Sequence, residues 1–423
     1  MTSPSIPRPA SGVELIPVRD GGMLFDQQGQ KLFHLNPMAA TIWRQINGRR
    51  DIDDIADAVA DAAAIDPGKA RHFVLDMLKA WRRIGLLLDH GESRPATRVD
   101  DPSEIWPAAS SDDLLVPIKS ARRHYEMLGT AFSLGFSNKT LERIVHPALD
   151  HLSSGMASDG CHYLDLVEVP GEIRVIHEKH IAGRCARLEN LAPLLHGLLG
   201  LLAIRNCRYL MAIHASGLER DGNALMLAGK SGSGKTTMAA GLMASGWGYM
   251  SDDTILLLPQ NLDAIGVPYS LTIKPGAWPI LRSRFPALEQ APVHTRSDNQ
   301  SVRYLSPPRR AFSRPCAVRW IGFPHQSTAG GSSMRHLDHV EGLYRLLEHC
   351  CAIPLFLNSR DIRCLTRWSA KIRFFEFATA NIGDAIAQVA TLVSADLPPL
   401  PTLDDSRMDP SPSYAVIPPA SPA

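Results

Sequence analysis

A glycine-rich loop in the middle of the chain constrains the fold more than any other feature of the sequence. The segment GKSGSGKT, residues 229–236, satisfies the pattern G-x-x-x-x-G-K-[ST] in full. A short apolar run, Ala224–Ala228, precedes the loop, and apolar residues at helical spacing follow it as far as Gly246. Because strand, loop and helix are the context that this motif requires, the sequence predicts an α/β domain built around a phosphate-binding loop.

The residue types in this loop explain why it would bind a polyphosphate. Successive backbone N–H groups and the positive end of the following helix dipole surround the phosphates, and glycine lets the backbone approach them closely. Lys235 is expected to reach the β- and γ-phosphates, and the Thr236 hydroxyl to ligate Mg²⁺. We therefore predict ATP and Mg²⁺ as cofactors, with a nucleotide site made of Gly229, Lys230, Ser231, Gly232, Ser233, Gly234, Lys235, Thr236 and Thr237.

Two adjacent carboxylates follow the loop at the end of a second apolar run. Asp252 and Asp253 come 17 and 18 residues after Lys235. Next to a phosphate loop, one carboxylate can hold a metal ion and the other can accept a proton from an attacking hydroxyl. His214 lies in an apolar run one hairpin before the loop. A lone histidine in such a run is more often a core residue, but this position favours a place in the site.

These segments resemble the HPr kinase/phosphorylase family. The similarity rests on IHASGLERDGNALMLAGKSGSGKTT followed by GWGYMSDD; it is specific over residues 209–258 and looser over the rest of the block. It implies a mixed sheet with helices and a serine/threonine kinase. It further implies that Asp252 is the general base and that Asp253 supports the metal with Thr236. His214 would lie beside the base and tune it, and the order within the aspartate pair can also be reversed.

The chain departs from that family in two ways. Thr237 follows Thr236 where the family usually has an acidic residue. The C-terminal signature associated with phosphorolysis and with hexameric contacts has no convincing copy here. We therefore expect a kinase whose substrate is not HPr. Lys274, at the end of a later apolar run, is either a phosphate or substrate contact or a surface lysine.

The first block of the chain, residues 12–90, has a different pattern. Three short strands are predicted at Val13–Pro17, Met23–Phe25 and Lys31–Leu35. Capping residues at Asn36, Asp51 and Asp66, two of them followed by proline, then predict three helices. In the third helix the apolar residues at helical spacing are Phe73, Val74, Met77, Leu78, Trp81 and Ile84. This is a small α+β, winged-helix-like module.

This block resembles the PqqD-like family of leader-peptide recognition domains, on the run from FHLNPMAATIW to RRIGLL. The resemblance implies that a leader peptide adds as a strand beside Lys31–Leu35 and lies against the helix bearing His72, Leu75 and Arg82. An ordinary winged-helix domain that binds DNA is the alternative. Arginines in the block favour DNA binding. The negative charge of nearby aspartates opposes phosphate binding on the same surface: Asp51, Asp53, Asp54, Asp57, Asp61 and Asp66.

Composition bounds the remaining possibilities. The 423 residues suggest a recognition domain at 12–90, a linker at 91–115, a kinase domain at 116–394 and a disordered proline-rich tail at 395–423. Lys plus Arg (44) balance Asp plus Glu (43), so no nucleic-acid partner is expected. The most apolar stretch, 194–204, is too short to cross a bilayer and predicts a buried helix, so no membrane partner is expected.

Neither cysteine nor histidine spacing predicts a metal centre. Seven cysteines are present without a Cys-x-x-Cys pair, which fits a reducing cytoplasm. Five of the histidines between the two main motifs lack metal-ligand spacing, and we interpret them as surface or core residues: His146, His151, His162, His177 and His180.

Taken together, these patterns predict an ATP- and Mg²⁺-dependent kinase fused to its own leader-peptide recognition domain. The first block would capture a precursor peptide and raise its effective concentration at the kinase site. The context points to lasso-peptide-type precursors by analogy. Two alternatives stay open: a kinase of a small molecule or another protein, and a nucleotide-gated peptide chaperone with little catalysis. The preference for ATP over GTP and the formation of a homo-oligomer also stay open.

Overall fold

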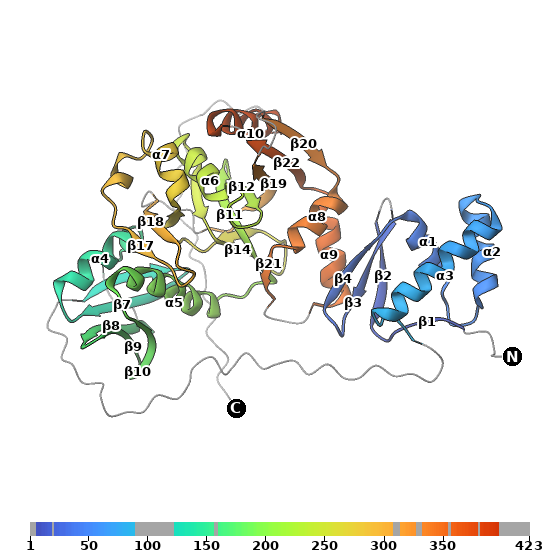
Figure 1. The fold of residues 1–423 in the computed structure, drawn as a ribbon, viewed down its shortest axis with the longest axis horizontal. Coiled ribbons are helices and arrows are strands. Elements are labelled where there is room, and N and C mark those ends of the chain that lie inside the picture. The colour runs from blue at the N-terminus through green and yellow to red at the C-terminus, as the bar shows by residue number, and fades with distance from the viewer. Residues whose placement is uncertain are drawn as a thin grey trace, which may run out of the picture.

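The structure is a computed structural model that describes residues 6–18, 21–88, 122–155, 160–307, 314–326, 332–353, 357–379 and 381–396. The predicted linker at 91–115 lies outside the described residues, as does the predicted tail from residue 397 onward. The described part is a mixed α/β protein with an N-terminal domain and a larger body (Figure 1).

The N-terminal domain combines a three-stranded antiparallel sheet, in the order β2-β3-β4, with three helices. The three predicted strands are confirmed with bounds that differ by at most two residues at either end. Its elements are β1 (Arg8–Pro9), β2 (Val13–Val18), β3 (Gly21–Asp26), β4 (Lys31–Leu35), α1 (Pro37–Gln45), α2 (Ile52–Ala63), α3 (Pro67–Arg83) and β5 (Leu87–Leu88).

The three helices begin where capping chemistry predicts. Side chains of Asn36, Asp51 and Asp66 each accept a hydrogen bond from a backbone N–H group of the first helical turn. The helices enclose a core in which the rings of Trp43 and Trp81 meet edge to face, with centroids 5.0 Å apart. The helix starts and the core are therefore set largely by local sequence.

The predicted third helix is confirmed as α3, but its apolar residues divide between the core and the surface. The helix buries Ala70, Val74, Leu78 and Trp81, whereas Phe73 is 47% exposed and Ile84 is 44% exposed. A single stripe of side chains is enough to pack α3 onto its domain. Of the other apolar residues at helical spacing, Met77 packs against the core, whereas Phe73 and Ile84 lie on the surface.

The larger body contains a nine-stranded mixed sheet, whose main order is β15-β14-β11-β12-β19-β22-β20. Strands β12, β19 and β22 are parallel, and the other pairs along that order are antiparallel. The strands are β11 (Met211–Arg220), β12 (Asn223–Ala228), β13 (Gly248–Ser251), β14 (Thr254–Leu257), β15 (Ala264–Gly266), β19 (Ala317–Gln326), β20 (Ser333–Leu337), β21 (Cys350–Ala352) and β22 (Arg373–Thr379).

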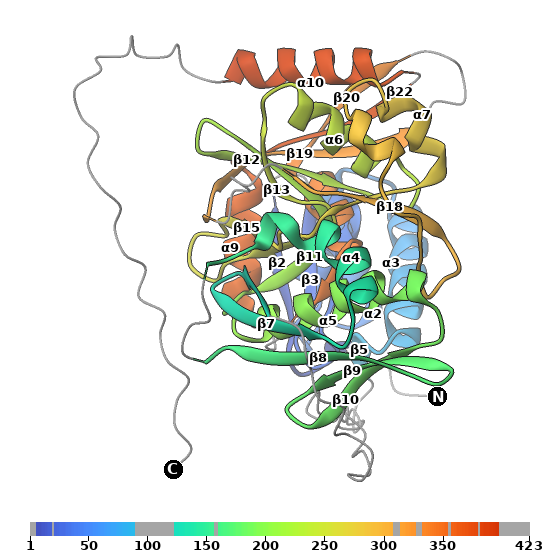
Figure 2. The same ribbon diagram turned by 90° about the vertical axis from the view of Figure 1, so that its left-hand side faces the viewer.

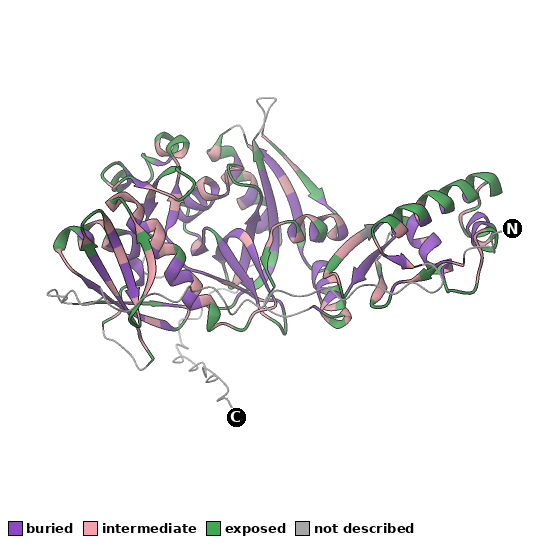
Figure 3. Ribbon diagram, turned by 60° about the horizontal axis from the view of Figure 1, so that its bottom comes forward, coloured by how far each residue is buried: buried purple, intermediate pink, exposed green. Residues whose placement is uncertain are grey.

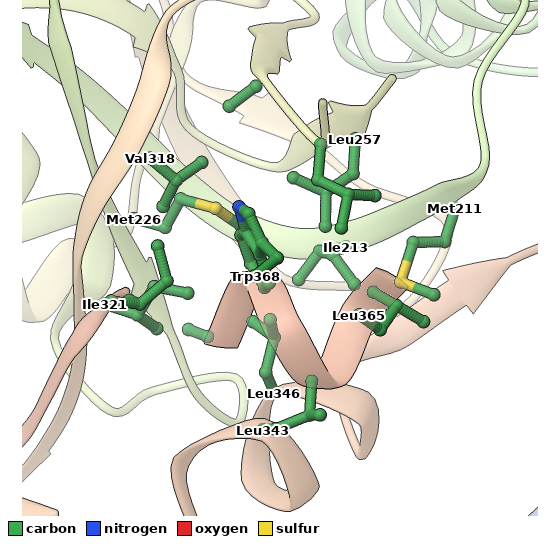
Figure 4. Packing of buried hydrophobic residues seen from close by; sticks show 14 of the residues in the cluster. Met211, Ile213, Met226, Leu257, Val318, Ile321, Leu343, Leu346, Leu365 and Trp368 are labelled. Atoms are coloured by element: carbon green, nitrogen blue, oxygen red, sulfur yellow. The ribbon is translucent and has the colours of Figure 1, made fainter. Parts of the chain in front are cut away.

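Helices cover both faces of this sheet. Leu225 and Leu227 of β12 pack toward α6 (Lys235–Ala244) and α10 (Ile382–Asp396). The alternate residues Ala224 and Met226 pack toward α8 (His339–Leu347) and α9 (Ser359–Ser369). The central strands are accordingly buried on both faces (Figure 3), and Trp368 and Leu365 of α9 point toward the sheet residues Ile213 and Met226 (Figure 4).

A second sheet of five strands, in the order β10-β9-β8-β7-β6, lies at the opposite end of the body from α10 (Figure 2). Its core is shared with α4 and α5. A three-stranded sheet, β16-β18-β17, also belongs to the body. The elements are β6 (Arg123–Met127), β7 (Thr130–Phe136), α4 (Lys139–Leu149), β8 (His162–Val169), β9 (Glu172–His177), β10 (His180–Cys185), α5 (Leu191–Arg205), β16 (Leu271–Ile273), α7 (Trp278–Leu281), β17 (His294–Thr295) and β18 (Ser301–Leu305).

Helix α5 contains the apolar stretch 194–204 and is largely buried, as predicted. Among the described residues, no helix combines the length and the hydropathy that a membrane span requires.

The N-terminal domain packs against the larger body through β3 and α9. Leu24 faces the domain's own helices, whereas Met23 and Phe25 join the core cluster that contains Leu365 and Trp368 of α9. Strand β3 is therefore buried on both faces. Arg363 of α9 also donates to Glu14 of β2 at 2.5 Å. These contacts hold the two parts of the chain side by side (Figure 1).

Candidate functional site

The glycine-rich loop connects β12 to α6 at the end of the parallel part of the sheet. Gly232 and Gly234 have φ values of +86° and +98°, a left-handed conformation that favours glycine. A Cβ atom on Gly229 would lie only 2.8 Å from Ser233 Oγ, so the loop closes tightly over this position. Within the described part of the chain, that Ser233 hydroxyl is buried without a hydrogen-bond partner.

Lys235 is the first residue of α6 and its side chain is turned back into the loop. Its Nζ donates to the carbonyl oxygens of Gly229 at 2.6 Å and Lys230 at 3.2 Å. Burial lowers the pKa of Lys235, while the neighbouring charges of Asp252 and Asp253 oppose that shift. Two backbone carbonyl oxygens of the loop thus hold the ammonium group in place.

Lys274, whose role the sequence left open, lies beside the same loop. It follows β16, and its Nζ donates to Ser231 Oγ at 2.8 Å. The structure therefore brings a second lysine to the loop from a segment 43 residues further along the chain.

Asp252 is buried at the end of β13, and three donors bind its carboxylate. Oδ1 accepts from Ser216 Oγ at 3.0 Å, and Oδ2 accepts from Thr236 Oγ1 at 3.1 Å. The backbone N–H of Thr272 donates to Oδ2 at 2.9 Å. Burial raises the pKa of Asp252 to about 7, although these hydrogen bonds work against the rise.

Asp253 differs from Asp252 in its exposure, in its hydrogen-bond partners and in the direction of its pKa shift. Its side chain is 56% exposed, and its Oδ1 lies 3.2 Å from Nδ1 of His214. Burial of the group would raise the pKa of Asp253, but the hydrogen bond and charge of His214, with a contribution from Arg296, hold it below the usual value. The two adjacent aspartates therefore have different environments, one enclosed and one open.

His214 lies at the centre of the sheet, between β14 and β21. Its backbone N–H donates to the carbonyl oxygen of His349 at 2.8 Å, and its paired residue on β14 is Thr254. The structure thus brings His214 next to Asp253, and Lys235 and Thr236 next to Asp252. The loop, the histidine and both aspartates form one continuous site, to which the predicted residue Thr237 contributes the next position of α6.

Two participants were missed by sequence reasoning. Ser216 could have been found, because it lies two residues after His214 on the same strand and therefore points to the same face. Thr272 contributes only a backbone N–H, which no sequence pattern marks. Arg296, which directly follows β17, also contributes positive charge near Asp253.

Comparison with known proteins identifies the N-terminal domain. Residues 21–87 match the family model described as coenzyme PQQ synthesis protein D (PqqD). A solved structure described as TbiB1 in complex with the TbiA(beta) leader peptide is 20% identical, covers 20% of this chain and 99% of its own, and has a TM-score of 0.19. No curated protein matches the chain. The N-terminal domain is therefore PqqD-like.

Proposed function

We propose that this chain is an ATP- and Mg²⁺-dependent kinase that phosphorylates a serine or threonine of a precursor peptide held by its PqqD-like domain. The observation that carries the proposal is the hydrogen bond between Thr236 and Asp252. It joins the glycine-rich loop to the aspartate pair, so that a nucleotide on the loop would have its terminal phosphate beside two carboxylates.

The loop residues fit a nucleoside triphosphate. Two glycines with positive φ, the start of α6 and the Lys235 ammonium supply backbone and side-chain donors to phosphate oxygens. The buried Ser233 hydroxyl is a further donor for such a ligand. Lys274, already at the loop, adds a second positive charge for the negative charge that spreads over a transferring phosphoryl group.

Thr236 and Asp252 fit Mg²⁺, because a hydroxyl and a carboxylate are the oxygen ligands that this ion prefers. When bound, Mg²⁺ supplies positive charge that neutralises the phosphates. Asp252 is enclosed by three donors, so a peptide hydroxyl has poor access to it. These contacts support the metal-holding role for Asp252, which is the reverse of the order first expected.

Asp253 is the better candidate for the general base. Its carboxylate is exposed, so an acceptor hydroxyl can reach it, and the contact with His214 orients it. His214 would also stabilise the carboxylate by hydrogen bonding and take part in passing the proton onward. The imidazole thus acts on Asp253 rather than on Asp252.

Capture of the peptide is supported by the edge of the small sheet. Strand β4 has β3 on one side and, among the described strands, none on the other. An extended peptide can add to such an edge by backbone hydrogen bonds. Phe73 and Leu75 on α3, and Ile84 directly after it, are exposed and offer apolar contacts for the side chains of the peptide.

The contact between β3 and α9 supports a capture surface close to the phosphate-loop site. His349 hydrogen bonds His214, and α9 begins ten residues later at Ser359. Ten residues span at most about 35 Å even when fully extended. A core peptide that follows its leader by a short spacer can therefore reach Asp253 while the leader stays bound, which gives the high effective concentration that tethering requires.

The test is incubation of the full chain with ATP, Mg²⁺ and candidate precursor peptides, followed by mass spectrometry. A gain of one phosphate that is lost in Asp253→Asn supports the proposal. ATP-dependent binding without any mass change supports the chaperone alternative, and phosphorylation of a peptide without its leader at the same rate supports a kinase of another substrate. Deletion of the first 90 residues is a poor test, because it would expose the apolar residues of α9 that β3 covers.

A further inference from the structure

Two histidines that the sequence separates by 15 residues meet where the interior strands β8 and β9 of the five-stranded sheet begin and end, respectively. His162 begins β8 and His177 ends β9, and His162 Nδ1 lies 3.0 Å from His177 Nε2. Glu178 follows directly, with its Oε1 3.7 Å from the same Nε2 atom. We propose that His162, His177 and Glu178 form a binding site for a divalent transition-metal ion of the Zn²⁺ type, separate from the phosphate loop.

The distances between the three ligand atoms suit such an ion. All three atoms lie within 4.8 Å of one another. In a tetrahedral zinc site with bonds of about 2.0–2.1 Å, neighbouring ligand atoms lie roughly 3.3–3.4 Å apart. The separations of 3.0 and 3.7 Å bracket that value. Two imidazole nitrogens and one carboxylate oxygen are also a ligand set that zinc takes.

The register of the strands explains why these side chains converge. Leu164 pairs with His177 across β8 and β9, and His162 lies two residues before Leu164, so both histidines point to one face of the sheet. A two-residue turn then links β9 to β10, and His180 pairs with His177 across it. His180 is therefore placed on the same face as a candidate fourth ligand.

The turn itself has an unusual composition. Glu178 and Lys179 both have positive φ, +51° and +69°, where asparagine and glycine are the usual residues. Such conformations persist only where the surroundings determine them, and they concentrate at functional sites. Here the turn brings the Glu178 carboxylate back to the His177 ring, which is the arrangement that a metal ion would hold.

The environment also keeps the imidazoles ready to bind a metal. The ring of His162 stacks on Phe132 with centroids 5.7 Å apart, which fixes its orientation.

The test is Zn²⁺ binding to the full chain by isothermal titration calorimetry, with Mg²⁺ in excess so that the oxygen ligands near the phosphate loop are already engaged. We expect one Zn²⁺ per chain, with affinity at least tenfold weaker in His162→Ala, His177→Ala and Glu178→Gln. His336→Ala, an exposed histidine on β20, is the matched control and should bind like the unchanged protein. Co²⁺ should give the intense visible absorption of a tetrahedral nitrogen-ligated site.

The Glu178→Gln variant keeps the test valid if the histidine variants fold poorly, because this side chain is exposed and of equal size. Absence of Zn²⁺ binding, or binding that is unchanged in His162→Ala and in Glu178→Gln, would overturn the proposal. Lys235→Ala should bind Zn²⁺ normally, so the outcome is independent of the proposed kinase activity. Loss of Zn²⁺ binding in that variant would also count against a separate site.

Discussion

Gln30 hydrogen bonds both backbone polar groups of Leu357, a residue 327 positions away. Its Nε2 donates to the carbonyl oxygen at 3.0 Å, and its Oε1 accepts from the N–H at 2.8 Å. The Gln30 amide thus gives the N–H and carbonyl groups of Leu357, just before α9, the hydrogen-bond partners that a neighbouring strand would otherwise provide. Met23 and Phe25 of β3 pack against α9 as well. These contacts and the Gln30 hydrogen bonds attach the PqqD-like domain to the larger body.

Replacing Gln30 should weaken that connection. Gln30→Ala leaves the Leu357 N–H and carbonyl without their partner, at a cost of about 1–3 kcal/mol. We expect a lower midpoint of thermal unfolding and slower phosphorylation of a peptide that carries its leader. Gln28→Ala, in the same turn but exposed, is the control. Equal midpoints and rates for the two variants would contradict this account of the interface.

The loop lysine should be essential for phosphoryl transfer. Lys235→Ala removes the buried ammonium group, and we expect a loss of about 10²–10³ in kcat, as for other preorganised electrostatic groups. Lys139→Ala is a control, because this lysine is exposed at the start of α4 and lies outside the loop. Steady-state kinetics with the peptide substrate would check both variants, and comparable losses would argue against a specific role for Lys235.

Substitution of the two aspartates should affect different steps, catalysis for Asp253 and Mg²⁺ binding for Asp252. Asp253→Asn should lower kcat about 10²–10⁴-fold with nucleotide binding retained, because it removes the group that accepts the hydroxyl proton. Asp252→Asn should mainly raise the Mg²⁺ concentration needed for activity, because that side chain contacts Thr236. Mg²⁺ titrations of both variants distinguish them; the opposite pattern would restore Asp252 as the base.

Metal-free stability should depend on pH through Asp252. Its pKa is about 7 in the folded protein against 3.8 in the unfolded chain, so the folded state binds more protons between these values. Stability therefore falls as pH rises from 4 to 7, by up to about 4 kcal/mol. Urea unfolding in EDTA at pH 5 and pH 8 should show this loss in the unchanged protein and a smaller loss in Asp252→Asn. Parallel pH profiles would refute the assignment.

The exposed apolar residues of α3 should matter for peptide binding and little for stability. Phe73→Asp places a charge on a surface that is already solvated, so unfolding should change by less than about 0.5 kcal/mol. Leader-peptide affinity, measured by fluorescence anisotropy, should fall at least tenfold if the peptide lies against this face. Asp61→Asn, an exposed change on α2, is the control. An unchanged affinity in Phe73→Asp would place the peptide elsewhere.

Sequence alone determined the features that depend on neighbours in the chain. The phosphate-loop pattern, the caps at Asn36, Asp51 and Asp66, the strands of the first domain and the adjacency of the two aspartates all follow from local spacing. Backbone conformation and capping are short-range effects, so a few consecutive residues are enough to specify them.

Tertiary structure decided everything that depends on which distant groups surround a side chain. Asp252 and Asp253 have identical carboxyl groups, but only that of Asp252 is enclosed. Ser216, Thr236 and the Thr272 backbone donate hydrogen bonds to Asp252 alone. Strand register likewise brought His162 to His177. Burial, electrostatic environment and ligand geometry arise from packing between remote segments, and no spacing along the chain encodes them.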